Sequence, residues 1–397
     1  MLKSYKYRIY PNKEQVVKLN QTLGVCRFVY NYMLNKKIEA YKKDKTKLSA
    51  FDLCYRLKDL KKEFTWIADV DSQAVQMSVK TIDVAFGNFF KGTGYPKFKK
   101  KIDKQSFQCS NNTRRIDWEN YTLTIPKIKN IPIVLSKKFD GQIRNITITK
   151  TTTGKYFASI LVKDDVTIPE LKPIEKDKCI GLDTGIKSFV ISSDGRTFEA
   201  NRHLKSNLDR LKILQRRASK KRKGSNNRKK ANKSVALLHE KITNKRLDYI
   251  HKVTNTLISE NQAISTIFVE DLNVAGLLKN HKLAQAMSDV SLSKFYEILG
   301  YKCKWNGINL VKIDRFSPSS KRCSNCGSIK SELKLSEREW TCEHCNTHHD
   351  RDMNAANNIL WYGLETIFNN KTSVGSREVP VEQPTLVGAM KQESIFV

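Results

Sequence analysis

Four cysteines place the strongest single constraint on how this chain of 397 residues can fold. Cys323 and Cys326 form one C-x2-C pair, 15 residues follow, and Cys342 and Cys345 form the second pair. Each pair predicts a tight turn that presents two thiolates, and four thiolates satisfy the tetrahedral coordination of Zn²⁺. The spacing therefore predicts a structural zinc ribbon over residues 319–346.

Disulfide bonds are not expected in this chain. Its N-terminus does not resemble a secretion signal, and no stretch approaches the roughly 20 apolar residues of a membrane-spanning helix. The five other cysteines are scattered singly and are expected to be buried thiols in a reducing prokaryotic cytoplasm: Cys26, Cys54, Cys109, Cys179 and Cys303. Because four thiolates already complete the zinc site, the histidines near it are expected to be polar loop residues: His344, His348 and His349.

Three acidic residues occur in three different structural contexts. Asp183 follows Ile180 and Leu182, in a segment that reads as the first strand of an antiparallel meander. Glu270 ends a short apolar, β-branched run that follows a long helical stretch, a pattern typical of a buried parallel strand. Asp352 comes just before a good helix start, which predicts that its carboxylate lies in the first turn.

A strand Asp, a strand-end Glu and a helix-start Asp, in this order, are typical of RNase H-like nucleases of the RuvC type. Hydrolysis of a phosphodiester develops charge on the entering and leaving oxygens, and two divalent ions about 4 Å apart stabilise both. Hard ions such as Mg²⁺ or Mn²⁺ take carboxylate ligands. Any one of these acids would more often cap a helix or close a turn. Together they favour a catalytic metal site of Asp183, Glu270 and Asp352, with Asp350 as the local competitor for the third position.

Charge independently indicates a nucleic-acid partner. Lysine and arginine number 72 against 40 aspartate and glutamate residues, a formal net charge of +32. A compact fold with this charge repels itself unless a polyanion neutralises it. A membrane surface is the rival partner, but the basic residues are spread through segments expected to fold. Neither a membrane nor a small-molecule substrate is expected.

Several segments closely resemble TnpB, the OrfB-type protein of bacterial insertion sequences and a relative of type V CRISPR effectors. The likeness is carried by residues 269–274, 280–284, 314–326 and 348–356, and it extends from residue 6 to the helix after Asp352. The resemblance implies an RNA-guided DNA endonuclease that binds a guide RNA from the transposon end. It further implies cleavage of double-stranded DNA beside a short transposon-associated motif, with the acidic trio and the four zinc ligands at matching positions.

Periodicity and the resemblance together predict a multidomain α/β fold. Residues 3–10 read as a strand, residues 12–15 have capping-box spacing before a helical region, and residues 121–162 alternate with period two. The expected organisation is a wedge β-barrel (1–10 and 96–175) interrupted by a helical recognition domain (11–95), then an RNase H-like nuclease (176–318 and 347–370) interrupted by the ribbon (319–346), and a disordered tail (371–397).

Three groups of residues are candidates for nucleic-acid contacts. The most basic stretch reads as a helical hairpin opened near Gly224, which would neutralise phosphates through Arg216, Arg217, Lys221, Arg222, Arg228 and Lys229. Lys97, Lys99 and Lys100 are interleaved with aromatic residues, as in an RNA-binding run, although a solvated basic loop is an equal alternative. Gln73 and Gln76 could bond to base edges near the flanking motif, although amides on a helix are usually only surface residues.

Two other functions fit parts of the pattern. A transposase can use the same fold, but transposases of the acidic RNase H class typically arrange their residues as Asp, Asp, Glu. A nuclease-dead, RNA-guided DNA-binding repressor would lack one of the three acids, and this chain has all three. A dimeric junction resolvase would need neither the first 170 residues nor the ribbon.

Overall fold

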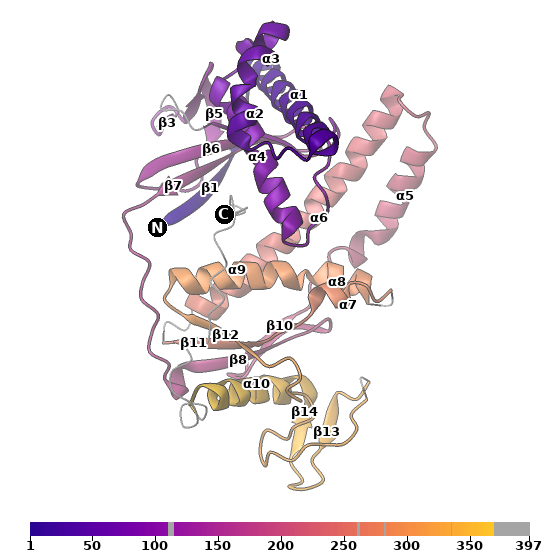
Figure 1. The fold of residues 1–397 in the computed structure, drawn as a ribbon. Coiled ribbons are helices and arrows are strands. Elements are labelled where there is room, and N and C mark those ends of the chain that lie inside the picture. Colours follow the sequence, from indigo (N-terminus) through magenta and orange to yellow (C-terminus); the bar gives the residue numbers. More distant parts are fainter. Residues whose placement is uncertain (110–114, 260–262, 282, 335, 369–397) are drawn as a thin grey trace. The chain divides into compact units, whose positions relative to one another are not determined.

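The computed structural model describes residues 1–109, 115–259, 263–281, 283–334 and 336–368, and the tail predicted for 371–397 lies outside these ranges (Figure 1). The chain forms two compact units, one covering Met1–Val166 and the other beginning at Thr167. Each unit has its own sheets and hydrophobic clusters. The two are described separately.

The first unit is built on a seven-stranded sheet in the order β2-β6-β7-β1-β5-β4-β3. Residues from strands near both ends of the sheet, such as Phe107 and Leu123, share one hydrophobic cluster, so the sheet curves around a common core. Within the described residues β2 and β3 are not paired, and closure into a barrel stays a prediction. The strands are β1 (Leu2–Ile9), β2 (Gln105–Cys109), β3 (Arg115–Asp117), β4 (Thr122–Ile125), β5 (Ile128–Val134), β6 (Gln142–Lys150) and β7 (Tyr156–Lys163).

The helices of this unit separate β1 from the other six strands along the chain. They are α1 (Lys13–Asp44), α2 (Ala50–Tyr55), α3 (Leu57–Glu63), the 3-10 turn η1 (Thr65–Asp69) and α4 (Ser72–Phe90). The predicted capping box is confirmed, because the side chain of Asn12 accepts from the backbone of Gln15 and the side chain of Gln15 accepts from that of Asn12. The helices pack around a core that includes Met33, Ile67 and Val79.

The second unit contains a five-stranded mixed sheet in the order β10-β9-β8-β11-β12. Its strands are β8 (Cys179–Thr184), β9 (Ser188–Ser192), β10 (Thr197–Glu199), β11 (Thr266–Glu270) and β12 (Asn309–Ile313). Strands β8, β11 and β12 are parallel, and the meander β8-β9-β10 is antiparallel, as its sequence predicts. Gly195, with φ of 91°, forms the turn between β9 and β10.

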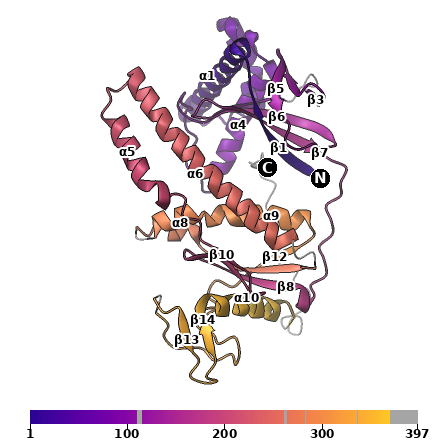
Figure 2. The same ribbon diagram turned by 180° about the vertical axis from the view of Figure 1, so that it is seen from behind.

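Helices cover both faces of this sheet (Figure 2). The side chains of Ile267 and Val269 on β11 join a cluster with α6 (Asn226–Ser259) and α9 (Leu292–Trp305). The intervening Phe268 joins Ile359 of α10 (Arg351–Phe368) on the opposite face. This alternation is why β11 reads as a continuous apolar run.

The remaining elements of this unit complete the description of its fold. The predicted basic hairpin is confirmed: α5 (Leu208–Ser219) packs against α6 on either side of a turn at Gly224. The smaller elements are α7 (Val274–Leu277), α8 (Ala284–Val290), β13 (Glu339–Thr341), β14 (His348–Asp350), and the 3-10 turns η2 (Lys176–Lys178) and η3 (Lys205–Asn207). Within the described ranges, none of the helices has the length and apolar character needed to span a membrane. Of the five predicted buried thiols outside the ribbon, only Cys54 is not fully buried.

Candidate active site and zinc site

The strand register brings Asp183 and Glu270 together. Leu182 on β8 lies beside Val269 on β11 in a parallel pair, so the next residue on each strand is Asp183 and Glu270 respectively. Neighbouring strands lie about 4.8 Å apart. The two acids therefore reach the same carboxyl edge of the sheet side by side.

Helix α10 supplies Asp352 on the same face. Gly181 and Asp183 share one face of β8, because alternate residues of a strand point the same way. A Cβ on Gly181 would lie 2.3 Å from the carbonyl oxygen of Ala356 and 2.5 Å from the backbone nitrogen of Leu360, so only glycine allows α10 to approach β8 this closely. The helix begins at Arg351, and its first turn carries Asp352.

Electrostatics links the three acids. Burial, followed by the negative charges of Glu270 and Asp352, raises the pKa of Asp183 to about 8, while Arg351 acts in the opposite direction. A buried carboxyl whose charge is disfavoured by two neighbouring carboxylates is a group that a divalent cation would stabilise. Among the described residues, the four cysteines form a compact cluster whose possible ligand atoms all lie within 4.8 Å of one another.

The raised pKa of Asp183 predicts an unusual pH dependence. Between its ordinary pKa of 3.8 and its folded-state pKa of about 8, the folded protein keeps a proton that the unfolded chain has lost. Raising the pH therefore lowers the free energy of unfolding, by at most about 1.4 kcal/mol per pH unit. We expect Asp183→Asn to remove this dependence when no Mg²⁺ or Mn²⁺ is added.

The measurement is thermal unfolding of both proteins between about pH 5 and pH 9, with bound zinc retained. The variant should gain stability relative to the wild type as the pH rises. A constant difference between the two midpoints over this range would contradict the raised pKa of Asp183.

Glu270 and Asp352 each have a polar partner of their own, and the adjacent Asp271 has different partners. The hydroxyl of Ser319 donates to Glu270 Oε1 at 2.6 Å, and Arg338 lies 3.5 Å from Asp352 Oδ1. Asp271 pairs instead with Lys312 and Arg315. No local pattern in the sequence indicated Ser319 or Arg338, because each reaches its acid from a different part of the chain.

Asp350 has a different role from Asp352. Its Oδ1 accepts a hydrogen bond of 2.8 Å from the backbone N–H of Met353, so it caps the N-terminus of α10. Asp350 is an exposed residue. Asp352 raises the pKa of Asp183, whereas Asp350 caps the helix that carries Asp352, and the assignment of Asp352 as the third ligand stays a prediction.

Two buried asparagines attach the ribbon to α10. Asn354 accepts from the backbone N–H of Ser324 and donates to the carbonyl of Arg322, and Asn358 donates to the carbonyls of Ser319 and Arg322. Their exposed fractions are 2% and 0%. The helix that carries Asp352 therefore also holds the segment that contains Ser319 and the start of the first cysteine pair.

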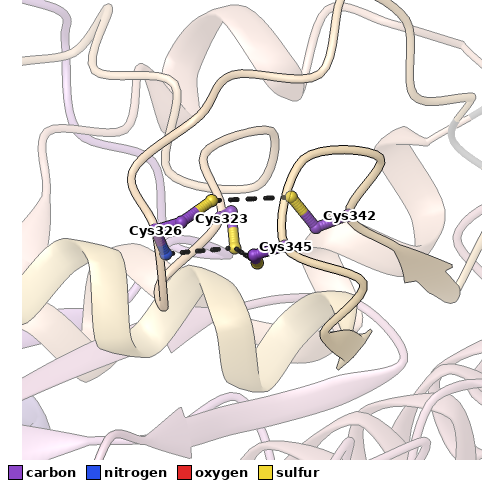
Figure 3. A group of neighbouring side chains, drawn as sticks. All are labelled: Cys323, Cys326, Cys342 and Cys345. Carbon is purple, nitrogen blue, oxygen red and sulfur yellow. Dashed lines mark hydrogen bonds between the residues drawn. The ribbon is translucent and has the colours of Figure 1, made fainter.

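The four predicted zinc ligands come together (Figure 3). The Sγ atoms of Cys323 and Cys345 are 3.6 Å apart, as are those of Cys326 and Cys342, and all four lie within 4.8 Å of one another. Tetrahedral coordination with Zn–S bonds of about 2.3 Å would place the sulfurs about 3.8 Å apart. The donor set and its spacing fit a structural Zn²⁺.

The two cysteine pairs form matching turns. Gly327 donates to the carbonyl of Cys323, and Asn346 donates to the carbonyl of Cys342, each at 2.9 Å. Both residues have left-handed backbones, with φ of 82° and 57° respectively. Glycine and asparagine are the residues that tolerate this conformation best, which explains their positions directly after the second cysteine of each pair.

Hydrogen bonds favour the thiolate form of two of the four cysteines. The side chain and backbone of Thr347 lower the pKa of Cys345 to about 5, and the hydroxyl of Ser328 lowers the pKa of Cys342. Burial instead raises the pKa of Cys323 to about 11. Zinc binds thiolates, so the cluster combines ligands that ionise easily with one whose proton a metal must displace.

The prediction for His349 was wrong. It is a buried residue of β14, not a polar loop residue, and its Nε2 lies 3.0 Å from the sulfur of Cys323. Its ring also packs against Trp340. With a proton on Nε2, His349 would donate a hydrogen bond to the thiolate of Cys323 and support the predicted zinc site from outside the four-thiol set. His348 is exposed as predicted, but it too lies on β14 and not in a loop, whereas His344 is an exposed turn residue, as predicted.

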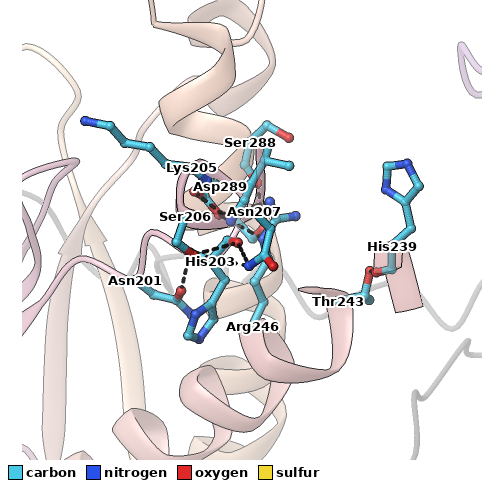
Figure 4. A network of polar contacts seen from close by, with 12 residues as sticks. Asn201, His203, Lys205, Ser206, Asn207, His239, Thr243, Arg246, Ser288 and Asp289 are labelled. Atoms are coloured by element: carbon cyan, nitrogen blue, oxygen red, sulfur yellow. Dashed lines mark hydrogen bonds and ion pairs between the residues drawn. The ribbon is translucent and has the colours of Figure 1, made fainter. Parts of the chain in front are cut away.

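Most of the candidate residues on the basic hairpin are exposed. These are Arg216, Arg217, Lys221, Arg222 and Lys229, whereas Arg228 is partly buried and donates to the carbonyl of Lys221. Asp289, which is 5% exposed, fixes the base of the hairpin by binding Arg246 of α6 and the backbone N–H groups of Leu204 and Lys205 (Figure 4). The hairpin is therefore a cationic projection with an anchored base.

The candidate residues of the first unit differ in their surroundings. Lys97, Lys99 and Lys100 are all exposed residues, but the ammonium of Lys99 lies 3.8 Å from the centre of the Tyr30 ring, and desolvation of this group lowers its pKa. Gln73 and Gln76 are exposed on α4.

Two exposed aromatic residues lie on the neighbouring helix α2. Phe51 and Tyr55 are 78% and 73% exposed, and α2 packs against α4. Lys80 of α4 lies over the Phe51 ring. Sequence analysis missed these rings, although their i, i+4 spacing on a short helix was a visible signal.

Three family models match parts of the chain. They are a helix-turn-helix domain over residues 1–46, the OrfB_IS605 model described as a probable transposase over residues 159–281, and a Cas12f1-like TNB domain over residues 293–359. In this structure, residues 1–44 form β1 and the single helix α1.

Relatives match almost the whole chain. A "Putative RNA-guided DNA endonuclease" of Streptomyces pristinaespiralis is 38% identical, with 91% of this chain and 89% of that protein covered. The "Putative RNA-guided DNA endonuclease InsQ" of Escherichia coli (strain K12) is 31% identical, with 98% and 99% covered. The "TnpB-like protein L79" of Acanthamoeba polyphaga mimivirus is 26% identical, with 93% and 75% covered.

A solved structure has a similar fold. The protein chain in a cryo-EM structure of a Cas12f1-sgRNA-target DNA complex aligns with a TM-score of 0.56 at 16% identity, covering 88% of this chain and 83% of that one. Fold and site together define the class, a mixed α/β multidomain protein that resembles Cas12f1 and carries a four-cysteine cluster. The chain belongs to the TnpB (OrfB_IS605) family of insertion-sequence proteins.

Proposed function

We propose that this protein is an RNA-guided DNA endonuclease that cuts double-stranded DNA by metal-dependent hydrolysis beside a short transposon-associated motif. One observation carries the chemical part of the proposal: parallel pairing of β8 with β11 aligns Asp183 with Glu270, and the acid of the first turn of α10 shares their electrostatics. The names of the two most similar relatives described above support two further parts of the proposal: RNA guides the protein, and DNA is its substrate.

The nuclease proposal also rests on topology. Numbered from β8, the sheet order is 3-2-1-4-5 with the second strand antiparallel, the arrangement of RNase H-like folds. Three carboxylates could hold two Mg²⁺ or Mn²⁺ ions, as the hydrolysis of a phosphodiester requires. These ions would activate the attacking water and neutralise the leaving oxygen.

The protein's own residues would hold and orient this site. Asp183 and Glu270 provide carboxylate oxygens at the sheet edge, and Asp352 provides a third from α10. Ser319 restricts the rotation of Glu270 through its hydrogen bond. Asp183 must lose its proton when a cation binds, so cation binding and proton release are coupled at this residue.

The other domains are proposed to bind nucleic acid. The wedge domain (1–10 and 96–175) and the helical recognition domain (11–95) would contact the guide RNA and the flanking motif, the nuclease would comprise 176–318 and 347–370, and the ribbon 319–346. Gln73 and Gln76 are exposed on α4, and the helix α2 that packs against α4 exposes the rings of Phe51 and Tyr55, so these two helices offer hydrogen bonding and apolar contact for base edges. The anchored basic hairpin suits phosphates.

Cleavage at physiological salt tests guidance by RNA. We expect the protein with its copurified RNA to cut a duplex that matches the guide beside the flanking motif, and mismatches next to that motif to stop cutting, because pairing begins at that end. Removing the RNA should also stop cutting. Binding alone is no test, since a chain of +32 binds most nucleic acids at low salt.

The control is the same duplex with mismatches at the far end from the motif, which should still be bound. Efficient cutting of every duplex by RNA-free protein would overturn guidance and favour a transposase, the activity in the description of the OrfB_IS605 model. Guided binding without any cutting would indicate a repressor.

A further inference from the structure

Phe316 has the highest exposed fraction, 87%, among the large hydrophobic side chains of the described ranges. It lies in residues 314–319, which we call the 314–319 loop, between β12 and the first cysteine pair of the ribbon. Single exposed apolar residues are common on protein surfaces. This one lies in the same loop as Ser319, which contacts Glu270 of the acidic trio.

The 314–319 loop is fixed to the residues that end β11. Ser319 donates to the carboxylate of Glu270 at 2.6 Å, and Arg315 donates to the carbonyl of Asp271 at 2.9 Å as well as pairing with its carboxylate. Both ends of the segment around Phe316 are therefore held at the carboxyl edge of the sheet.

The backbone at Phe316 is also held from within the loop. Its N–H donates to Asp314 Oδ1 at 2.8 Å, and the N–H of Ser317 donates to the carbonyl of Asp314 at 3.2 Å. Because the backbone is fixed, only the two side-chain torsions of Phe316 have to be ordered when a partner contacts the ring.

Chain geometry limits the distance between the ring and the acids. Consecutive Cα atoms are 3.8 Å apart, so the Cα atoms of Phe316 and Ser319 are separated by at most about 11 Å. Ser319 contacts Glu270 directly. A nucleotide bound at the acidic trio would therefore have neighbours within reach of the Phe316 ring, and the partly exposed cations Lys312 and Arg315 lie beside it.

We propose that Phe316 stacks on a nucleobase of the DNA strand held for cleavage, close to the scissile phosphate. The proposal rests on the function proposed above. Stacking on an aromatic ring tolerates every base, which suits an enzyme that leaves sequence recognition to base pairing. It would hold the strand so that the phosphate meets Asp183, Glu270 and Asp352.

The test combines a protein change with a substrate change. Single-turnover cleavage of a guide-matched duplex is measured for wild type and Phe316→Ala, with a single abasic nucleotide scanned across the cut region. We expect Phe316→Ala to slow cleavage of the intact duplex on the order of tenfold, as for loss of one stacked base. At one position, the abasic nucleotide should slow the wild type similarly but slow the variant no further.

Phe316→Tyr should restore cleavage, because its ring can also stack. Ile329→Ala is the matched control, since Ile329 is an apolar ribbon residue that is 60% exposed. This variant should cut like the wild type. If Phe316→Ala and the abasic nucleotide slow cleavage independently at every scanned position, so that their effects multiply, stacking is overturned. A changed oligomeric state of Phe316→Ala that accounts for its slower cleavage would overturn it as well. Absence of guided cleavage by the wild type would defeat the proposed function and this proposal together, whereas normal wild-type cleavage without coupling defeats only the role of Phe316.

Discussion

Replacing Asp183, Glu270 or Asp352 by alanine is expected to abolish DNA cleavage while leaving guided binding largely intact. Each acid would contribute carboxylate oxygens to the metal site, and loss of one disrupts the charge stabilisation on which the chemistry depends. Affinity for DNA instead comes from guide pairing and from many separate cations. Cleavage and binding of one matched duplex should be measured for each variant, and we expect at least a thousandfold loss of rate, roughly the order seen when a main electrostatic group is removed.

Asp350→Ala is the matched control for Asp352→Ala. Both changes remove an aspartate at the start of α10, but Asp350 caps the helix through the N–H of Met353. Its loss should lower stability by about 1 kcal/mol, as for other N-terminal caps, and leave cleavage measurable. Abolished cleavage in Asp350→Ala together with an active Asp352→Ala would reverse the assignment of the third ligand.

Removing the structural metal is expected to have the second largest effect. We expect one tightly held Zn²⁺ per chain, lost in Cys323→Ser or Cys342→Ser. Asn354 and Asn358 bind the segment leading to the first cysteine pair, so loss of zinc should loosen α10 as well as the ribbon. Structural zinc contributes about 10 kcal/mol or more to the folding of small zinc domains, so local unfolding should follow.

The measurements are metal analysis and hydrogen exchange of α10 and the ribbon. Faster exchange should be confined to these elements, and the sheet of the first unit should keep its protection. Cys54→Ser is the control, because Cys54 is partly exposed and distant in sequence from the four-thiol cluster. Finding iron in place of zinc, or no metal in the wild type, would contradict the zinc assignment.

Local patterns predicted the elements of the site well. The apolar run before Glu270, the meander after Asp183 and the helix start at Asp352 are all present, and the paired cysteines come together as their spacing requires. These features succeed because each depends on a few consecutive residues. The role of the three acids in catalysis stays a prediction, as does Mg²⁺.

Contacts between distant segments were not predictable in this way. The bond from Ser319 to Glu270 depends on how a loop folds back on the sheet edge, and nothing around Ser319 in the sequence indicates it. His349 was misread for a related reason: as one of two adjacent histidines near a loop it looked polar, but the β13-β14 pairing turns it toward Cys323. Alternation along even a short strand decides which of two neighbours is buried.

The close approach of α10 to β8 has a consequence for the order in which the protein is made. Gly181 lies near the start of the nuclease sheet, whereas the helix that packs on it is the last described element of the chain. Synthesis proceeds from the N-terminus, so β8 and β11 emerge while the third acid is still missing. Under the function proposed above, an unfinished chain on the ribosome would carry the basic hairpin and two of the acids, but not the complete acidic trio that the proposed DNA cleavage requires.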